Sequence, residues 1–261
     1  MSLAREFSRL YEFREVLRNL VSSDLKLRFR RSFLGYGWSL LYPVLMMLIL
    51  AVVFSKVSKF PSPAKMIPYL FAGLVPWNFF VATCMSGSSS LLTNESLLKK
   101  IYLPKLIFPL SILLARFVDF LFNVLALFAV IALISFKPSL ALLTLPLAIL
   151  ILFLFVSGVT IALSAINVYV RDAAHLMSVL IQLGFFATPI IYREEELDAR
   201  YRMLLDFNPF THIVRVFHAI ISDGRFPDVH EWGFAALVSV GAFIFGSWIF
   251  TRLERNLIFR L

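Results

Sequence analysis

Long apolar stretches separated by short polar segments dominate the hydrophobic pattern of the chain. Each stretch has about the 20 residues or more that an α-helix needs to cross a bilayer. The predicted spans are 34–55, 67–92, 106–136, 139–170, 173–192 and 232–251. We therefore expect an all-α integral membrane protein with six transmembrane helices. The third and fourth stretches exceed one crossing, so they should tilt, protrude or break, with Pro146 as one candidate kink.

The segment before the first span has a different pattern, with apolar residues at helical spacing and charged residues on the other faces. The apolar positions are Leu3, Phe7, Leu10, Leu17, Leu20 and Val21. This is typical of an amphipathic helix that lies at a membrane surface, although a helix packed on a cytoplasmic partner would show the same pattern. We assign residues 1–32 to this helix and 33–261 to the six-span domain.

Residues 193–231, between the last two spans, are too polar to cross a membrane. The acidic run EEELD suits a helix N-terminus, and Asn208-Pro209 interrupts the helical pattern. The sequence predicts two short helices on the extracytoplasmic face, arranged as a re-entrant or membrane-surface lid.

Composition and charge agree with a membrane protein. Hydrophobic residues make up 60% of the chain, mean hydropathy is +0.84 and the formal charge is +9. The hydrophobic content excludes a soluble fold. In a membrane protein the positive charge indicates basic cytoplasmic loops, so we do not assign it to nucleic-acid binding. Lys and Arg are more numerous in the N-terminal and C-terminal segments and after spans two and four than in the alternate loops. Both termini are therefore expected in the cytoplasm. Charged residues before the first span argue against a cleaved signal peptide.

The sequence lacks the usual patterns of catalytic and metal sites. It has no G-x-x-x-x-G-K-[ST] phosphate loop, no G-x-S-x-G elbow and no histidine pair at metal-binding spacing. We expect no catalytic residue, bound cofactor or metal, and any ATP-derived energy must come from a partner. Arg116 and Asp119 are the clear ionisable residues within the spans, and their spacing favours a structural ion pair.

Two basic loops stand out on the predicted cytoplasmic side. Asn94 can cap a short helix ESLLKK that Pro104 ends, which gives a compact basic knob. The stretch NVYVRD forms a charged corner between two apolar runs. Solvated turns that follow the positive-inside bias would look the same.

Taken in order, five stretches resemble the polysaccharide-export branch of the ABC type-2 permeases, which export O-antigen, capsule and teichoic acid. They are RRSFLGYGWSLLYP at 30–43, NESLLKKIYLPKLIFPL at 94–110, NVYVRD at 167–172, TPIIY at 188–192 and FNPF at 207–210. The likeness spans nearly the whole chain. Gly37 departs from the family pattern, where a larger residue is more usual.

The resemblance implies a homodimer in the bacterial inner membrane that encloses a channel for a lipid-linked polysaccharide. Two copies of a separate ATPase subunit, which binds ATP and Mg, would drive it. The implied ATPase-coupling loop comprises Asn94, Glu95, Leu97, Leu98, Lys99, Lys100, Tyr102 and Pro104, next to a cytoplasmic corner at Arg171 and Asp172. The implied gate helices carry Asn208, Pro209, His212 and Arg215.

Aromatic residues are candidates for the channel, because flat rings can stack on many sugars. The proposed entrance and lining are Leu34, Gly35, Tyr36, Trp38, Tyr42, Tyr69, Trp77, Phe185 and Phe186. Aromatic residues near span ends are also common interfacial anchors. Gly35 and Gly37 would form a hinge that presents Tyr36 to the polymer.

Two other functions remain open from the sequence. The same permease could export a drug or a simple lipid. The tripeptide Gly35-Tyr36-Gly37 also occurs in potassium-channel filters, although the usual lead-in to such a filter is not obvious here.

Overall fold

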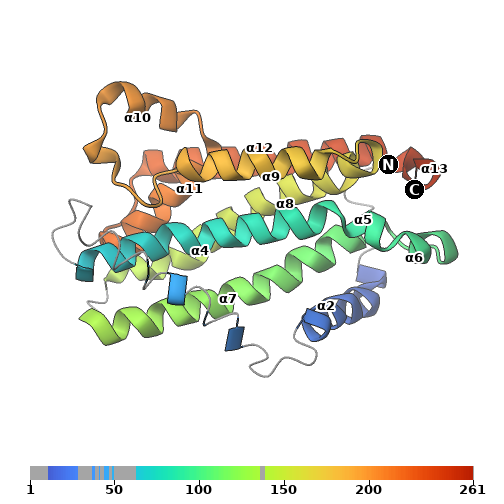
Figure 1. Ribbon diagram of the computed structural model, residues 1–261, viewed down its shortest axis with the longest axis horizontal. Helices are drawn as coiled ribbons and strands as arrows, with labels where there is room; N and C mark the ends of the chain where they lie inside the picture. Colours follow the sequence, from blue (N-terminus) through green and yellow to red (C-terminus); the bar gives the residue numbers. More distant parts are fainter. Residues whose placement is uncertain are drawn as a thin grey trace.

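The computed structural model describes residues 11–28, 37–38, 41, 44–46, 49, 63–135 and 139–260, and its regular elements there are all helical. The elements are α2 Arg14–Arg28, α4 Pro63–Ser88, α5 Ser90–Thr93, α6 Glu95–Lys100, α7 Ile107–Ser135, η1 Leu140–Thr144, α8 Leu145–Tyr169, α9 Ala173–Phe186, η2 Glu194–Glu196, α10 Ala199–Asp206, α11 Pro209–Phe217, η3 His218–Ser222, α12 Val229–Leu253, η4 Glu254–Asn256 and α13 Leu257–Arg260. The long helices run side by side as one bundle (Figure 1).

Among the described residues, four stretches are long and apolar enough to cross a membrane. They are Met66–Ser88, Ile107–Ala129, Leu140–Tyr169 and Val229–Asn256. The apolar helix α9 has 14 residues, a length of about 21 Å, which is less than the roughly 30 Å of a bilayer core. Most of the first predicted span lies outside the described residues. The chain is thus a multi-pass membrane protein.

Several predicted helix ends differ from the observed ones. The second predicted span ends at Ser88, after which the short α5 begins, and α9 stops at Phe186, well before residue 192. The fourth span divides where Pro146 stands, because α8 begins at Leu145 after the 3₁₀ turn η1. A proline in the first turn of a helix loses no internal hydrogen bond, so it favours a helix start at this point.

The core of the bundle is centred on α4 and α8. α8 packs along α12, and α4 packs against both α7 and α8. The α8–α12 crossing is very close: a Cβ atom added to Gly246 would overlap the backbone carbonyl of Gly158. Small residues of this kind let two membrane helices approach until their backbones touch.

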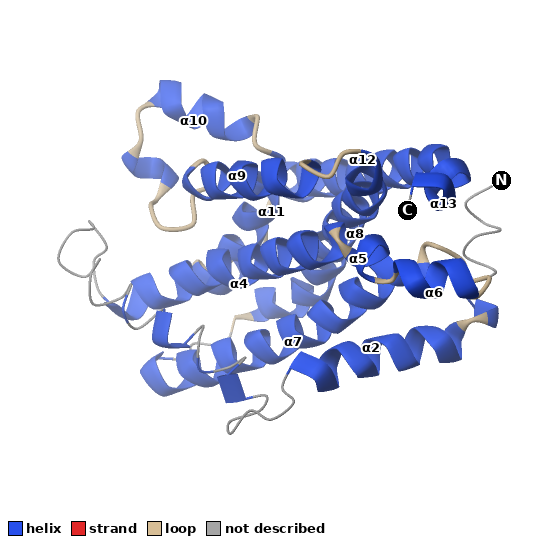
Figure 2. Ribbon diagram, turned by 45° about the vertical axis from the view of Figure 1, so that its right-hand side comes forward, coloured by secondary structure: helices blue, strands red, loops and turns tan. Residues whose placement is uncertain are grey.

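The two short predicted helices are α10 and α11, and they lie in different surroundings. α10 projects from one end of the bundle (Figure 2) and exposes Met203 and Leu204. α11 is instead wedged between α4, α8 and α12, with most of its side chains buried. The two short helices thus differ, with α11 packed inside the bundle and α10 outside it.

The opposite end of the bundle collects α6, α13 and the α8–α9 corner (Figure 1). Lys105 Nζ donates a hydrogen bond to the carbonyl of Glu254 at 2.6 Å, and the Tyr169 hydroxyl donates to the carbonyl of Leu253 at 2.8 Å. These bonds connect three segments that are distant in sequence.

Candidate functional site

The predicted coupling loop forms a compact knob at the α6 end of the bundle. Leu98 and Leu103 are buried beneath it, with 7% and 9% of their surface exposed. Ile101 follows the helix in extended conformation, and Ile101 and Tyr102 are exposed at 52% and 79%. Two exposed apolar side chains therefore lie beside the exposed Lys99 and Lys100.

The other residues of the predicted coupling loop also belong to this knob. Glu95 and Lys99 form an ion pair at 2.5 Å along the outer face of α6. Lys100 is exposed, Leu97 is half-buried and Pro104 is buried where the chain turns toward α7.

The expected cap by Asn94 is wrong. Its side-chain amide donates backward to the carbonyl of Ser90 at 2.8 Å, and it makes no capping bond to α6. Asn94 follows the helical turn α5, so the carbonyl of Ser90 is within reach and competes with the cap. The helix itself spans the predicted residues, Glu95–Lys100.

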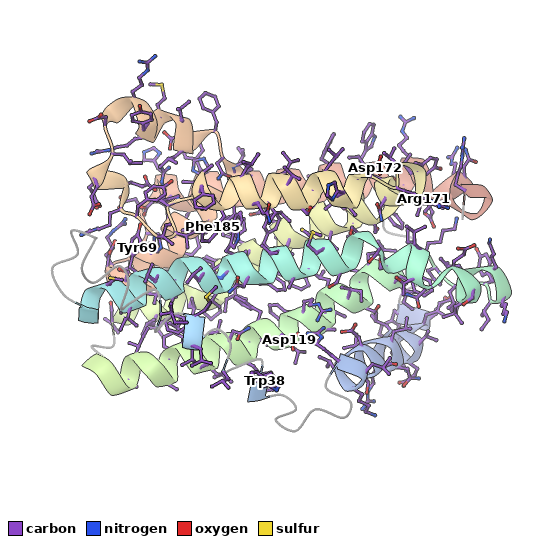
Figure 3. The ribbon with its side chains drawn as sticks, viewed as in Figure 1. Trp38, Tyr69, Asp119, Arg171, Asp172 and Phe185 are labelled. Carbon is purple, nitrogen blue, oxygen red and sulfur yellow. The ribbon has the colours of Figure 1, made fainter. Side chains whose placement is uncertain are left out.

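The α8–α9 corner is held by a residue that the sequence analysis did not single out. Arg171 and Asp172 are exposed (Figure 3). The buried Asn167 donates to the carbonyl of Ser88 at 3.0 Å and accepts from the backbone N–H of Ala174 at 3.2 Å. The signal that could have revealed it is an amide inside an otherwise apolar run, since a buried amide requires partners.

A charged cluster lies between α2 and α7. Arg116 Nη1 is 3.6 Å from Asp119 Oδ2, so the two predicted partners are close, and Arg28 of α2 also pairs with Asp119. Arg28 contacts Asp24 at 2.7 Å as well. The amphipathic helix therefore packs along α7 and supplies counter-charges, an arrangement that helical periodicity alone did not predict.

At the α10 end, Asn208 connects the short helices to α9. Its side-chain oxygen accepts from the Phe210 N–H at 3.1 Å, which caps α11 with Pro209 in the first turn. Its amide nitrogen donates to Thr188 Oγ1 at 2.8 Å and to the Ala187 carbonyl at 3.1 Å. One side chain thereby fixes the start of α11 against the end of α9.

Arg215 of α11 anchors the outer segment by two ion pairs. It contacts Glu194 and Asp206, each at 2.7 Å. Burial alone would lower the pKa of this guanidinium, but hydrogen bonds and charge pairing with the two carboxylates raise it above its ordinary value. His212 donates to the carbonyl of Asp206 at 3.0 Å. Arg215 and His212 thus hold α10 and α11 together.

The predicted aromatic residues do not share one surface. Tyr69 and Trp77 lie in the packed interior at 6% and 5% exposure, whereas Trp38 and Phe186 are exposed at 49% and 68%. Phe185 is half-buried, with its ring 5.8 Å from that of Trp77.

Packing accounts for the two buried rings. The hydroxyl of Tyr69 donates to the carbonyl of Tyr192 at 2.7 Å, and Trp77 packs against Phe210 of α11 at a ring distance of 5.1 Å. Both rings are therefore part of the packed interior of this chain. Leu34, Gly35, Tyr36 and Tyr42 lie outside the described residues.

Comparison with known proteins places these features in a family. Residues 15–221, well over half of the chain, match the ABC-2 type transporter family. A protein of Myxococcus xanthus named O-antigen export system permease protein RfbA is 31% identical over 88% of this chain and 89% of its own length. Two Klebsiella pneumoniae proteins of the same name are 26% identical over 97% of both chains and 27% identical over 86% of both. With its bundle of apolar helices, this chain belongs to the ABC-2 type transporter family.

Proposed function

We propose that the chain is the transmembrane subunit of an ATP-driven exporter that carries an O-antigen-like, lipid-linked polysaccharide across the bacterial inner membrane. The observation that carries this proposal is the match to three O-antigen export permeases, which covers most of this chain and most of each relative. This coverage matters because a match limited to one fragment would show only that the proteins have a pair of helices in common.

The knob formed by α6 and residues 101–102 is the proposed contact with a separate ATPase subunit. Two apolar side chains, Ile101 and Tyr102, project beside Lys99 and Lys100 at one end of the bundle. The leucines under the knob and the Lys105–Glu254 bond connect it to α7 and the C-terminal turns. ATP binding on a partner can shift the permease between states only through contacts that differ between those states.

The remaining parts of the assembly are proposed on the same basis. Two copies of the chain, each with six spans, would enclose the channel, and two ATPase copies would bind ATP and Mg. The α6 end and both termini would face the cytoplasm, and α10 and α11 would gate the exit. Exposed Phe186 and Trp38 are the members of the aromatic set best placed to meet a sugar ring.

The test is purification of the tagged permease from its native host. We expect a P-loop ATPase to co-purify, and we expect the triple variant Lys99→Glu, Lys100→Glu, Tyr102→Ala to lose its stimulation of ATP turnover. Tyr201→Ala is the matched control, because Tyr201 is an exposed tyrosine on α10, at the other end of the bundle. Normal ATPase coupling in the triple variant, or the lack of any ATPase partner, would contradict the proposal.

A further inference from the structure

A cavity of about 320 Å³, with a mostly apolar wall that carries several polar side chains, opens between α4 and α7, beside the end of α2. Trp38, Asn78, Arg116, Asp119 and Asn123 are among its lining residues. Its volume falls within the range of about 300 to 1,000 Å³ that is usual for small-molecule sites. Figure 3 shows Trp38 and Asp119 on the same side of the bundle, away from Tyr69 and Phe185.

Apart from Arg28 of α2, the charged and amide residues of this cavity lie within stretches that are apolar enough to span the membrane. Asn78 belongs to Met66–Ser88, and the other three, Arg116, Asp119 and Asn123, belong to Ile107–Ala129. Positions 116, 119 and 123 are three and four residues apart, so they share one face of α7. Ion pairing accounts for Arg116 and Asp119. Ion pairing does not account for the two asparagines that line the same cavity. Polar groups within membrane-spanning helices usually mark a functional site.

Three atoms on this face of α7 lack hydrogen-bond partners among the described residues. They are Arg116 Nε, Asp119 Oδ1 and Asn123 Oδ1. Asp119 is only 9% exposed, so water reaches it poorly. Buried polar atoms are rarely left unsatisfied in native proteins, and those that are require an explanation such as a ligand.

The chemistry of these atoms discriminates between ligands. One is an N–H donor and the other two are acceptors, and a sugar hydroxyl can both accept and donate. A phosphate oxygen could accept from Arg28, Arg116 and the asparagine amides, but it has no hydrogen to donate to the two unsatisfied acceptors, and the Asp119 carboxylate would repel it. The half-exposed indole of Trp38 adds a flat apolar face.

We propose that this cavity binds a sugar ring of the transported glycan, with Arg116, Asp119 and Asn123 bonded to its hydroxyls and Trp38 against its face. This rests on the proposed export function and adds a sugar-binding site between α4 and α7 of a single chain.

The experiment places the photoreactive residue p-benzoylphenylalanine at Trp38 in cells that synthesise the native glycan and express the whole transporter. Trp248 on α12 is the matched control, because it is a tryptophan of similar exposure, 50% against 49%, on a different helix. After illumination, we expect a permease adduct that carries glycan from position 38 and none from position 248.

The variant Asn123→Leu is expected to lower the adduct yield at position 38 about tenfold, which corresponds to about 1.4 kcal/mol of binding free energy. Its expression level and size-exclusion profile report whether it folds, and Asn78→Leu replaces it if it does not. No glycan adduct at position 38, equal adducts at both positions, or an adduct with phospholipid alone would overturn the proposal.

Failure of this inference is separable from failure of the export function. ATPase co-purification and surface glycan are measured in the same cells. If both are normal and position 38 gives no glycan adduct, the sugar site is refuted and the exporter stands. If no ATPase binds and no glycan reaches the surface, both proposals fail.

Discussion

Single buried polar side chains decide how the segments of this chain meet. Asn167 connects the end of α4 to the start of α9, and Asn208 connects the end of α9 to the start of α11. The sequence analysis had singled out Arg171 and Asp172 at the first of these corners. Their charge made them conspicuous, but charged residues at a membrane surface are commonly solvated, whereas a buried amide must find partners.

Replacing Asn167 should therefore cost more stability than replacing its charged neighbour. In Asn167→Leu the Ser88 carbonyl and the Ala174 N–H lose their partner, so we expect a loss of about 1 to 3 kcal/mol. The measurement is the thermal unfolding midpoint in detergent, with exposed Arg171→Leu as the control, which should change stability by less than about 0.5 kcal/mol. Equal shifts for the two variants would refute this role for Asn167.

His218 should make stability depend on pH. Burial lowers the pKa of His218 to about 3 from its usual 6.5, and its ring stacks on Tyr69 at 3.8 Å. The imidazole also lines a cavity of about 150 Å³ with charged residues, namely Arg193, Glu194, Glu195, Arg215, Asp223, Arg225 and Glu231. Because the unfolded chain binds the proton more readily, the stabilisation is complete above about pH 6.5 and is lost as the pH falls toward 3.

The variant His218→Phe keeps a ring against Tyr69 and removes the titrating group. We expect its unfolding midpoint to fall less steeply than that of the wild type between pH 6.5 and the lowest pH at which the protein stays soluble. The other groups of the cavity are unchanged in the variant, so the difference between the two curves isolates His218. Parallel curves would show that the carboxylates control the acid response.

At the scale of elements, α8 and α12 approach each other until their backbones are nearly in contact. A Cβ atom on Gly158 would overlap the backbone of Ala242, and one on Gly246 would overlap Gly158. The sequence predicted both helices but not which of their glycines face each other. Both helices are apolar on all sides, and a hydrophobic pattern without a polar face does not indicate the direction of packing.

Gly246→Leu should separate α8 from α12. Overpacking of a tight contact typically costs about 1 to 3 kcal/mol, and here the obstacle is backbone that cannot change rotamer. Gly241→Leu is the control on the same helix, because no atom described in the structure lies within 4 Å of its added Cβ. Both substitutions share the gain in helix propensity, so a lower unfolding midpoint in Gly246→Leu alone would report the contact.

At the scale of the whole molecule, α6 and α10 lie at opposite ends of the bundle (Figure 1). The distribution of Lys and Arg predicts that the α6 end faces the cytoplasm. Cys84 is buried and is the only cysteine in the sequence, so Cys84→Ser gives a background for single-cysteine labelling.

In that background, Arg200→Cys should react with a membrane-impermeant maleimide applied to intact spheroplasts. Tyr102→Cys should react only after the membrane is opened, because the knob would lie on the other side. Both native residues are exposed in this chain, so in cells that lack the partner ATPase only the membrane limits access of the reagent. Labelling of both positions from outside would contradict the predicted orientation.

The sequence by itself determined the membrane class, the position of most helices and the break at Asn208-Pro209. Each of these follows from the length and composition of a continuous segment. Only the tertiary structure decided that Tyr69 and Trp77 are buried, that α11 enters the bundle and that Asn78 and Asn123 line one cavity between α4 and α7. The physical reason is that helices in lipid are held together by close packing and polar contacts, and these depend on which faces meet.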